Sequence, residues 1–167
     1  MRTFKTPDAF QRYLATLAAK VEVAERRGLS AAGEMLEAST KAMIGEEVRE
    51  WADLAASTVA QKQARGQTGR ISDTDPLYAT GELRTSIGHH VQEHEVVVGS
   101  TDPIAPLLEH GTARMPARSF IGSTMFREGH RAADLVANHI MGAVAGKSEP
   151  LKTVLTSQQE GNGGLGP

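Results

Sequence analysis

Apolar residues recur at helical spacing along the first part of the chain. They are Phe10, Leu14, Leu17, Val21 and Ala24, separated by four or three residues. This spacing places them on one face of an α-helix. Just upstream, residues 6–8 read Thr-Pro-Asp, a typical helix start with a hydroxyl cap, proline in the first turn and a carboxylate near the positive end of the helix dipole.

A second helical pattern begins near Ser30 and reaches about Gly45, with Met35, Leu36, Ala42 and Met43 on its apolar side. Gly28 lies between the two patterns as a possible stop or kink. A glycine lowers helix propensity by only about 1 kcal/mol. The sequence therefore allows either two helices or one bent helix.

The apolar phase changes after Gly45. Residues Ile44, Val48, Trp51 and Ala55 can share a helical face, but that face does not continue the earlier one. Trp51 is the only tryptophan of the chain and is expected to anchor this region on the core, because a large aromatic side chain gains most from burial.

Residues 61–75 are polar, lack periodicity and predict a long loop. Lys62, Arg65 and Arg70 make this segment locally basic. A solvated loop is one interpretation. The other is a surface that contacts nucleic acid or an acidic partner.

Apolar and polar residues alternate from Ser86 to Val91, after a short helical turn around Leu83. A polar turn follows at residues 92–94, and a β-branched run at 96–98 leads to Gly99. This arrangement predicts an antiparallel β-hairpin.

The stretch from Ile104 to Ile121 predicts a short apolar helical turn, a glycine stop at Gly111 and a basic loop stiffened by Pro116. Apolar residues at helical spacing then predict one long amphipathic helix over about 120–145. The fold class is therefore α+β, with long helices packed on a small antiparallel sheet. Residues 1–146 are expected to form one domain, and the Gly-rich extension 147–167 to be disordered, flexible or held by a partner.

Composition narrows the class of protein. The chain has 167 residues, no cysteine, 4% aromatic residues and a formal net charge of −2, so disulfides, thiolate metal sites and a global basic field are excluded. The N-terminus lacks the apolar run of a signal peptide, and no stretch approaches the length needed to span a bilayer. A soluble protein that stays in the cytoplasm, without membrane contact, is the expectation.

Catalytic and cofactor motifs are missing from the sequence. Gly-Gln-Thr-Gly at 66–69 lacks the ending of a phosphate-binding loop, and there is no Gly-x-Ser-x-Gly or His-Glu-x-x-His motif. His89, His90 and His94 with neighbouring glutamates favour a polar hairpin face over a weak zinc site, since adjacent strand residues point to opposite faces. We therefore expect no cofactor, no metal and no enzymatic activity.

Glu109 lies just before the glycine stop of the 104–121 stretch. Its expected role is structural, because a general acid or base needs a second placed group and none stands out. We expect it to accept hydrogen bonds from the Gly111–Thr112 loop, or to pair with Arg84, Arg114 or Arg118.

Three segments together resemble one protein family. Residues 80–87, Thr-Gly-Glu-Leu-Arg-Thr-Ser-Ile, resemble its Thr-Gly-x-Leu-Arg-x-Ser-Ile segment, and Val98-Gly99 followed by residues 105–112 resembles its Val-Gly … Ala-Pro-x-x-Glu-x-Gly-Thr segment. Residues 115–121 resemble its Met-Pro-Ala-Arg-Pro-Phe-Leu loop, with Ser119 where proline is usual. The family is that of tail-completion, or head–tail joining, proteins of long-tailed bacteriophages. Trp51-Ala52-Asp53-Leu54 with Ser57-Thr58 further resembles the virion-morphogenesis family of Mu-like phages.

The resemblance covers about residues 48–145 and implies an α+β, non-enzymatic virion component in the neck, made in the host cytoplasm. It implies assembly of the protein with itself in a ring, expected to be a hexamer, and contact with head-closure, tail-terminator or tail-tube proteins. A tail terminator of the adjacent ring is an alternative of the same class. A small nucleic-acid-binding or hydrolytic domain is the alternative of another class.

A ring built from head-to-tail contacts needs two different surfaces on each subunit. The candidate partner-binding residues are Arg84, Arg114, Met115 and Arg118. Lys62, Arg65 and Arg70 are candidates to face DNA non-specifically in the lumen of the ring. Arg114 and Arg118 are expected to matter more for assembly than for folding of the subunit.

Overall fold

The computed structural model describes residues 3–45, 51–67 and 75–146. Its elements in chain order are α1 (Pro7–Met43), α2 (Ala56–Ala64), α3 (Glu82–Ser86), β1 (Ile87–Gln92), β2 (Glu95–Ser100), α4 (Ala105–His110) and α5 (Ile121–Val144). This architecture confirms the α+β class with long helices on a two-stranded antiparallel sheet. The predicted extension 147–167 lies outside the described residues.

The N-terminal region forms one helix rather than two, and α1 runs for 37 residues, about 55 Å at 1.5 Å per residue. The Thr6 hydroxyl accepts a hydrogen bond from the Ala9 N–H at 3.2 Å, as the predicted cap requires. Gly28 does not end the helix. A Cβ atom there would lie 2.9 Å from the Val136 Cα, so this glycine allows α5 to approach α1 closely.

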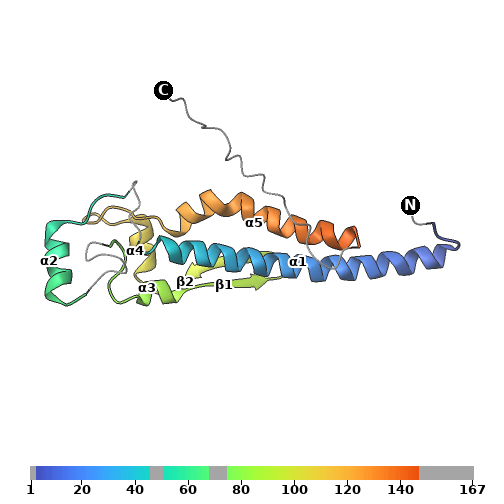
Figure 1. Cartoon of the computed structure of the whole chain (residues 1–167), viewed down its shortest axis with the longest axis horizontal. Coiled ribbons are helices and arrows are strands. Elements are labelled where there is room, and N and C mark those ends of the chain that lie inside the picture. The colour runs from blue at the N-terminus through green and yellow to red at the C-terminus, as the bar shows by residue number, and fades with distance from the viewer. Residues whose placement is uncertain (1–2, 46–50, 68–74, 147–167) are drawn as a thin grey trace, which may run out of the picture.

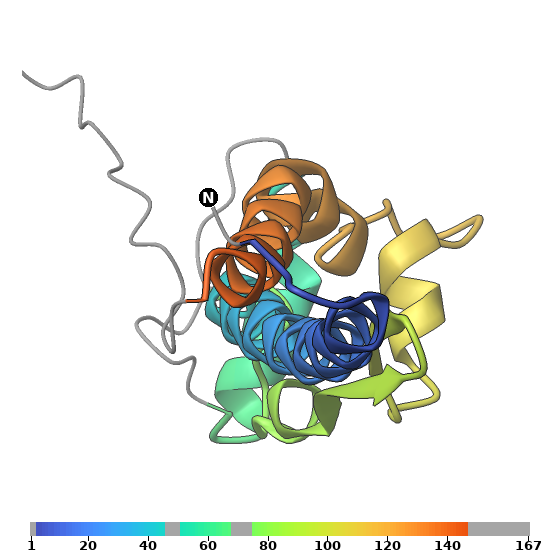
Figure 2. The same ribbon diagram turned by 90° about the vertical axis from the view of Figure 1, so that its right-hand side faces the viewer.

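Helix α1 lies between α5 on one side and the hairpin on the other, as the end-on view shows (Figure 2). Helix α5 runs antiparallel to α1 (Figure 1). Ala32 and Leu36 of α1 pack against Ala132 of α5 in one core cluster. A second cluster lies where the two helices approach α3 and α4, with Ile44 and Phe120 fully buried at its centre.

Strands β1 and β2 pair from Ile87 opposite Ser100 to Gln92 opposite Glu95. The predicted hairpin is therefore confirmed, with Glu93 and His94 as its two-residue turn. Glu93 has a φ of +46°, a left-handed backbone conformation that costs an L-residue about 1–2 kcal/mol.

Replacing Glu93 with glycine is expected to stabilise the fold by about 0.5–1 kcal/mol, because glycine adopts positive φ without the steric cost but loses more entropy on folding. Urea unfolding of Glu93→Gly and wild type measures the difference. Glu93→Ala is the matched control and should show no gain, because alanine retains the penalty. A similar gain in both variants would assign the effect to the carboxylate instead.

The expected helical face through residues 44–55 is wrong. Ile44 ends α1 in an extended conformation, Gly45 has a φ of +83°, and residues 51–55 are not helical. The expectation that Trp51 anchors on the core is confirmed, since its side chain is half-buried and packs against the cluster around Ile44 and Phe120. In the described part of the chain, no helix is both long and apolar enough to cross a membrane.

Candidate functional site

The three segments singled out in the sequence meet at one end of the elongated chain, around α3 and α4 (Figure 1). The hydroxyls of Ser86 and Ser100 lie 2.6 Å apart, and the Thr101 N–H donates to the Ser86 carbonyl at 3.1 Å. The Arg118 N–H donates to the Leu108 carbonyl at 2.8 Å. These hydrogen bonds link residues 80–87 to residues 98–101, and the end of α4 to the loop that follows it. We call the region formed by residues 80–87 and 98–121 the joint.

Glu109 caps the N-terminus of α5. Its carboxylate accepts hydrogen bonds from the backbone N–H groups of Phe120, Ile121 and Gly122 at 2.9, 3.0 and 2.8 Å. The Ser119 hydroxyl donates to the same carboxylate at 2.5 Å. Helix α5 has no acidic residue in its own first turn, so this distant carboxylate provides the negative charge that a helix N-terminus favours.

The electrostatics of Glu109 follow from this cap. Partial burial raises the pKa of the carboxyl, but the hydrogen bonds from Ser119 and from the backbone of Gly122, Ile121 and Phe120 together outweigh it and lower the pKa below 4.5. The predicted structural role is confirmed. The predicted partners, the Gly111–Thr112 loop and an arginine, were wrong.

The loop between α4 and α5 begins at Gly111, which has φ +73° and ψ −180°, a backbone region that is essentially restricted to glycine. Thr112 and Met115 then exchange backbone hydrogen bonds of 2.8 and 3.2 Å. The predicted glycine stop is confirmed, and this tight turn determines the direction in which Arg114 and Met115 extend.

Arg118 is 6% exposed, and its guanidinium donates to the backbone carbonyls of Ala52 and Asp53 at 2.9 and 3.4 Å. It therefore holds the 51–55 segment against the joint. The expectation that Arg118 is left for a partner is wrong, because the buried guanidinium is used within the chain.

Arg84 and Arg114 differ in whether the side chain is used within the chain or exposed to solvent. The Arg84 side chain is half-buried, and its Nε donates to the Lys41 carbonyl at 3.1 Å, in the last turn of α1. Arg84 therefore holds α3 against the end of α1. Arg114 is exposed, so among these three arginines it is the one placed to contact a partner.

Arg118→Ala is expected to destabilise the fold by about 2 kcal/mol, because it leaves two backbone carbonyls without a charged donor and removes packing. Arg114→Ala is its matched control and should change stability by less than about 0.5 kcal/mol, as exposed substitutions usually do. Thermal and urea unfolding of both variants measure the contrast. Equal losses would show that the internal bonds of Arg118 contribute little.

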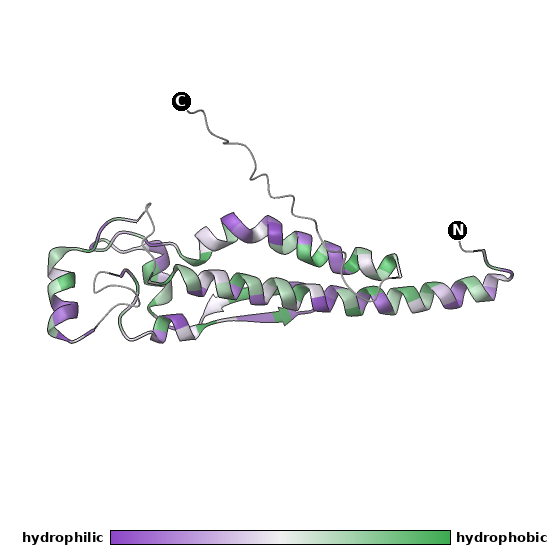
Figure 3. Cartoon of the chain, in the orientation of Figure 1, coloured by the Kyte–Doolittle hydropathy of each residue, from purple (hydrophilic) through white to green (hydrophobic). Residues whose placement is uncertain are grey.

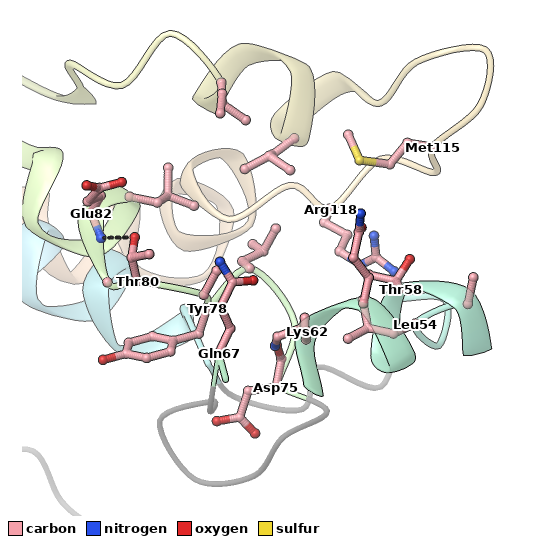
Figure 4. A pocket seen from close by; sticks show the side chains of 18 of the residues that line it. Leu54, Thr58, Lys62, Gln67, Asp75, Tyr78, Thr80, Glu82, Met115 and Arg118 are labelled. Atoms are coloured by element: carbon pink, nitrogen blue, oxygen red, sulfur yellow. Dashed lines mark hydrogen bonds between the residues drawn. The ribbon is translucent and has the colours of Figure 1, made fainter. Parts of the chain in front are cut away.

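A groove opens beside the joint, between α2, the 75–83 segment and the α4–α5 loop (Figure 4). Its volume is about 540 Å³. The larger apolar residues that line it are Leu54, Leu77, Tyr78, Leu83, Ile104, Leu108 and Met115. Carboxylates at the groove come from Asp53, Asp75, Glu82 and Asp102. An apolar floor with charged residues around it is suited to binding an apolar segment of a partner.

Of the three basic residues expected to face DNA, one is buried, one is exposed and one lies outside the described residues. Lys62 lies in α2 rather than in a loop, is 7% exposed and donates its ammonium to the Asp75 carbonyl at 2.8 Å. Its prediction as a lumen-facing residue is therefore wrong. Arg65 is exposed at the end of α2, and Arg70 lies outside the described residues.

The hairpin histidines pair with carboxylates of α1. The Nδ1 atom of His89 lies 2.6 Å from Glu37, and that of His94 lies 3.1 Å from Glu25. Hydrogen bonds from Lys41 and then from His89 lower the pKa of Glu37. Within residues 3–45, 51–67 and 75–146, no cluster of three or more His, Asp or Glu side chains could hold a metal ion.

The sequence did not reveal the groove. Leu54, Tyr78 and Ile104 come from three segments far apart in the chain, and none carries a local signal beyond being apolar. Comparison of the chain with family models, curated proteins and solved structures finds no match in any of the three.

Proposed function

We propose that this chain is a structural protein of the neck of a tailed bacteriophage, which completes the tail and joins it to the head by ring assembly. The observation that supports this proposal most is the arrangement of the joint. Its three segments carry the family-like residues, and their polar side chains are used mainly to hold elements of the fold together.

The roles of these residues explain why such motifs would recur in a structural protein. Glu109 caps α5, Gly111 permits the turn, and Arg118 holds the 51–55 segment. Each of these roles is architectural. Ser119, which stands where the family usually has proline, contributes a hydrogen bond to the Glu109 cap. A serine in place of the usual proline is therefore compatible with the loop conformation that the family motif implies.

Electron microscopy of particles assembled without this protein tests the proposal. In a phage that encodes the chain, deletion of its gene should leave DNA-filled heads and tails of normal length that are not joined. Tails of uncontrolled length would instead indicate a tail terminator, since a terminator ends polymerisation of the tube. Normal infectious virions would reject both.

Contact with DNA in the lumen remains a proposal for Arg65 and Arg70 alone, because Lys62 is buried. Replacing both arginines with glutamate should reduce retention of DNA in assembled particles. Lys152→Glu is a control charge change in the C-terminal extension, far from these positions in sequence. Unchanged DNA retention in the double variant would exclude the contact.

A further inference from the structure

Helix α1 extends well beyond the C-terminal end of α5 and beyond the hairpin (Figure 1). We call residues 3–20 the arm. Hydrophobic residues recur along it (Figure 3), yet Phe4, Phe10 and Leu14 remain 37%, 45% and 44% exposed. Phe4 packs on Phe10 and Tyr13, with ring centroids 5.3 and 5.0 Å apart, but this contact leaves apolar surface of the arm exposed to water, which favours burial against a partner.

The apolar stripe of the arm continues the face of α1 that contacts α5. Phe10, Leu14 and Leu17 share a helical face with Gly28, which lies against Val136 of α5. Helix α5 ends at Val144, and residues 143–146 line a pocket with Ala9, Tyr13 and Leu17 of the arm. Phe10 and Leu14 do not line that pocket and stay exposed, so their face is open to a further segment.

The groove at the opposite end of the chain fits such a stripe. Side chains at positions i, i+4 and i+7 are the usual anchors when an amphipathic helix binds in an apolar groove, and Phe10, Leu14 and Leu17 have this spacing. The groove of about 540 Å³ is large enough for several such side chains. Ile104 at the groove is 54% exposed, so the groove too has apolar surface open to water.

Charge also favours this pairing. The arm contains Lys5, Arg12 and Lys20 against a single carboxylate, Asp8. Lys62, Arg118 and Asp75 at the groove are buried, which leaves Asp53, Glu82 and half-buried Asp102 against one exposed cation, Arg114. Asp53 and Glu82 are exposed at the groove, so the edge of the groove is acidic and complements the basic charge of the arm.

We propose that the arm of one copy of this chain binds in the groove of a second copy, with Phe10, Leu14 and Leu17 facing Ile104 and Met115. The inference rests on the proposed ring assembly and names the two surfaces that would build it. Because the surfaces differ and lie at opposite ends of the chain, every copy offers one of each, and the contact is head-to-tail.

Two variants that each lose one surface test this contact. Phe10→Glu/Leu14→Glu disables the arm, and Ile104→Lys/Met115→Lys disables the groove. Native mass spectrometry and light scattering should find wild type as oligomers and each variant alone as monomers, with the dissociation constant raised about 100-fold or more. An equimolar mixture should form a 1:1 dimer and nothing larger, since one intact arm and one intact groove remain.

Several outcomes would overturn the proposal. Wild type that stays monomeric at several hundred micromolar, variants that still assemble, or a mixture that stays monomeric would each do so. An arm variant that is monomeric beside a groove variant that assembles normally would indicate arm-to-arm pairing. Loss of stability without any change in assembly would indicate that the arm is covered by its own chain.

Phe126→Lys is the matched control, because Phe126 is 88% exposed on α5 and does not line the groove. It should assemble like wild type. Far-UV circular dichroism verifies that each variant is folded. If the groove variant is not, Asp53→Lys/Glu82→Lys replaces it, since both side chains are exposed, and should weaken assembly in the same direction.

The experiment separates this inference from the proposed function. Wild-type rings with unaltered assembly of both variants would reject the arm–groove contact and leave a neck protein possible. Head-to-tail dimers in the mixture, combined with normal virions after gene deletion, would reject the neck function and retain the contact.

Discussion

Replacing Gly111 with alanine is expected to destabilise the fold by about 3 kcal/mol or more. A Cβ atom at this position would lie 2.6 Å from the Ala117 backbone N and 2.8 Å from the Met115 carbonyl O. Both neighbours are backbone atoms of the loop that leads into α5, so no side chain can rotate away. Alanine at this position must also adopt φ +73° and ψ −180°, a backbone conformation that costs an L-residue about 1–3 kcal/mol.

Gly66→Ala is the matched control for this prediction. Gly66 has a similar φ of +64°, but nothing lies within 4 Å of the position that a Cβ atom would take there. It should therefore lose only about 1 kcal/mol. Urea unfolding of the two variants measures how much more a Cβ atom costs at the crowded position of Gly111 than at the open position of Gly66. Similar losses at both sites would mean that the α4–α5 loop can move to accommodate the methyl group.

Local signals in the sequence were sufficient for much of the fold. Thr6-Pro7 marked the start of α1, Gly111 marked the end of α4, and the alternation after Ser86 marked the hairpin. Each of these features is determined by residues within one or two turns of each other. Two local patterns were misleading. Ile44 fits a helical pattern but ends α1 and is buried in the core, and residues 61–64, predicted as part of a loop, belong to α2.

The long-range contacts could not be read in the same way. Glu109 lies at the end of α4 and Arg118 in the loop that follows it, and their closeness in sequence favours pairing between neighbouring charges. Their observed partners are backbone groups: the first N–H groups of α5, and carbonyls 65 and 66 residues earlier in the chain. Every residue except proline carries both a backbone donor and a backbone acceptor, so only the fold determines which of them a buried charge will meet.

The cations of the chain divide into those that hold the fold together and those that are exposed to partners. Lys62, Arg84 and Arg118 looked equivalent to Arg65 and Arg114 in the sequence, because all are cations in polar segments. In the fold the first three donate to backbone carbonyls, whereas the other two are exposed. Partner contacts are therefore better sought at Arg114, at the groove and at the arm than at the buried cations.

Removing the Glu109 carboxylate is the second change with a large expected effect. Glu109→Ala should destabilise the fold by about 3 kcal/mol, because three N–H groups at the start of α5 and the Ser119 hydroxyl lose a charged acceptor together. Glu109→Gln keeps the shape and one acceptor oxygen, and should lose about 1–2 kcal/mol. Urea unfolding at pH 7 measures both variants against wild type.

Lowering the pH separates two contributions of the Glu109 cap to stability: its negative charge and its hydrogen-bond geometry. The folded-state pKa of Glu109 is lowered below 4.5, so its charge stabilises the fold above the unfolded-state pKa, and this contribution is lost as the pH falls through the folded-state pKa. The stability gap between wild type and Glu109→Gln should be full at pH 7 and narrow below about pH 4.5. Titration of Glu37 and other carboxylates occurs in both proteins and cancels in the difference. A gap that stays constant down to about pH 3 would mean that the hydrogen-bond geometry, and not the negative charge, stabilises the start of α5.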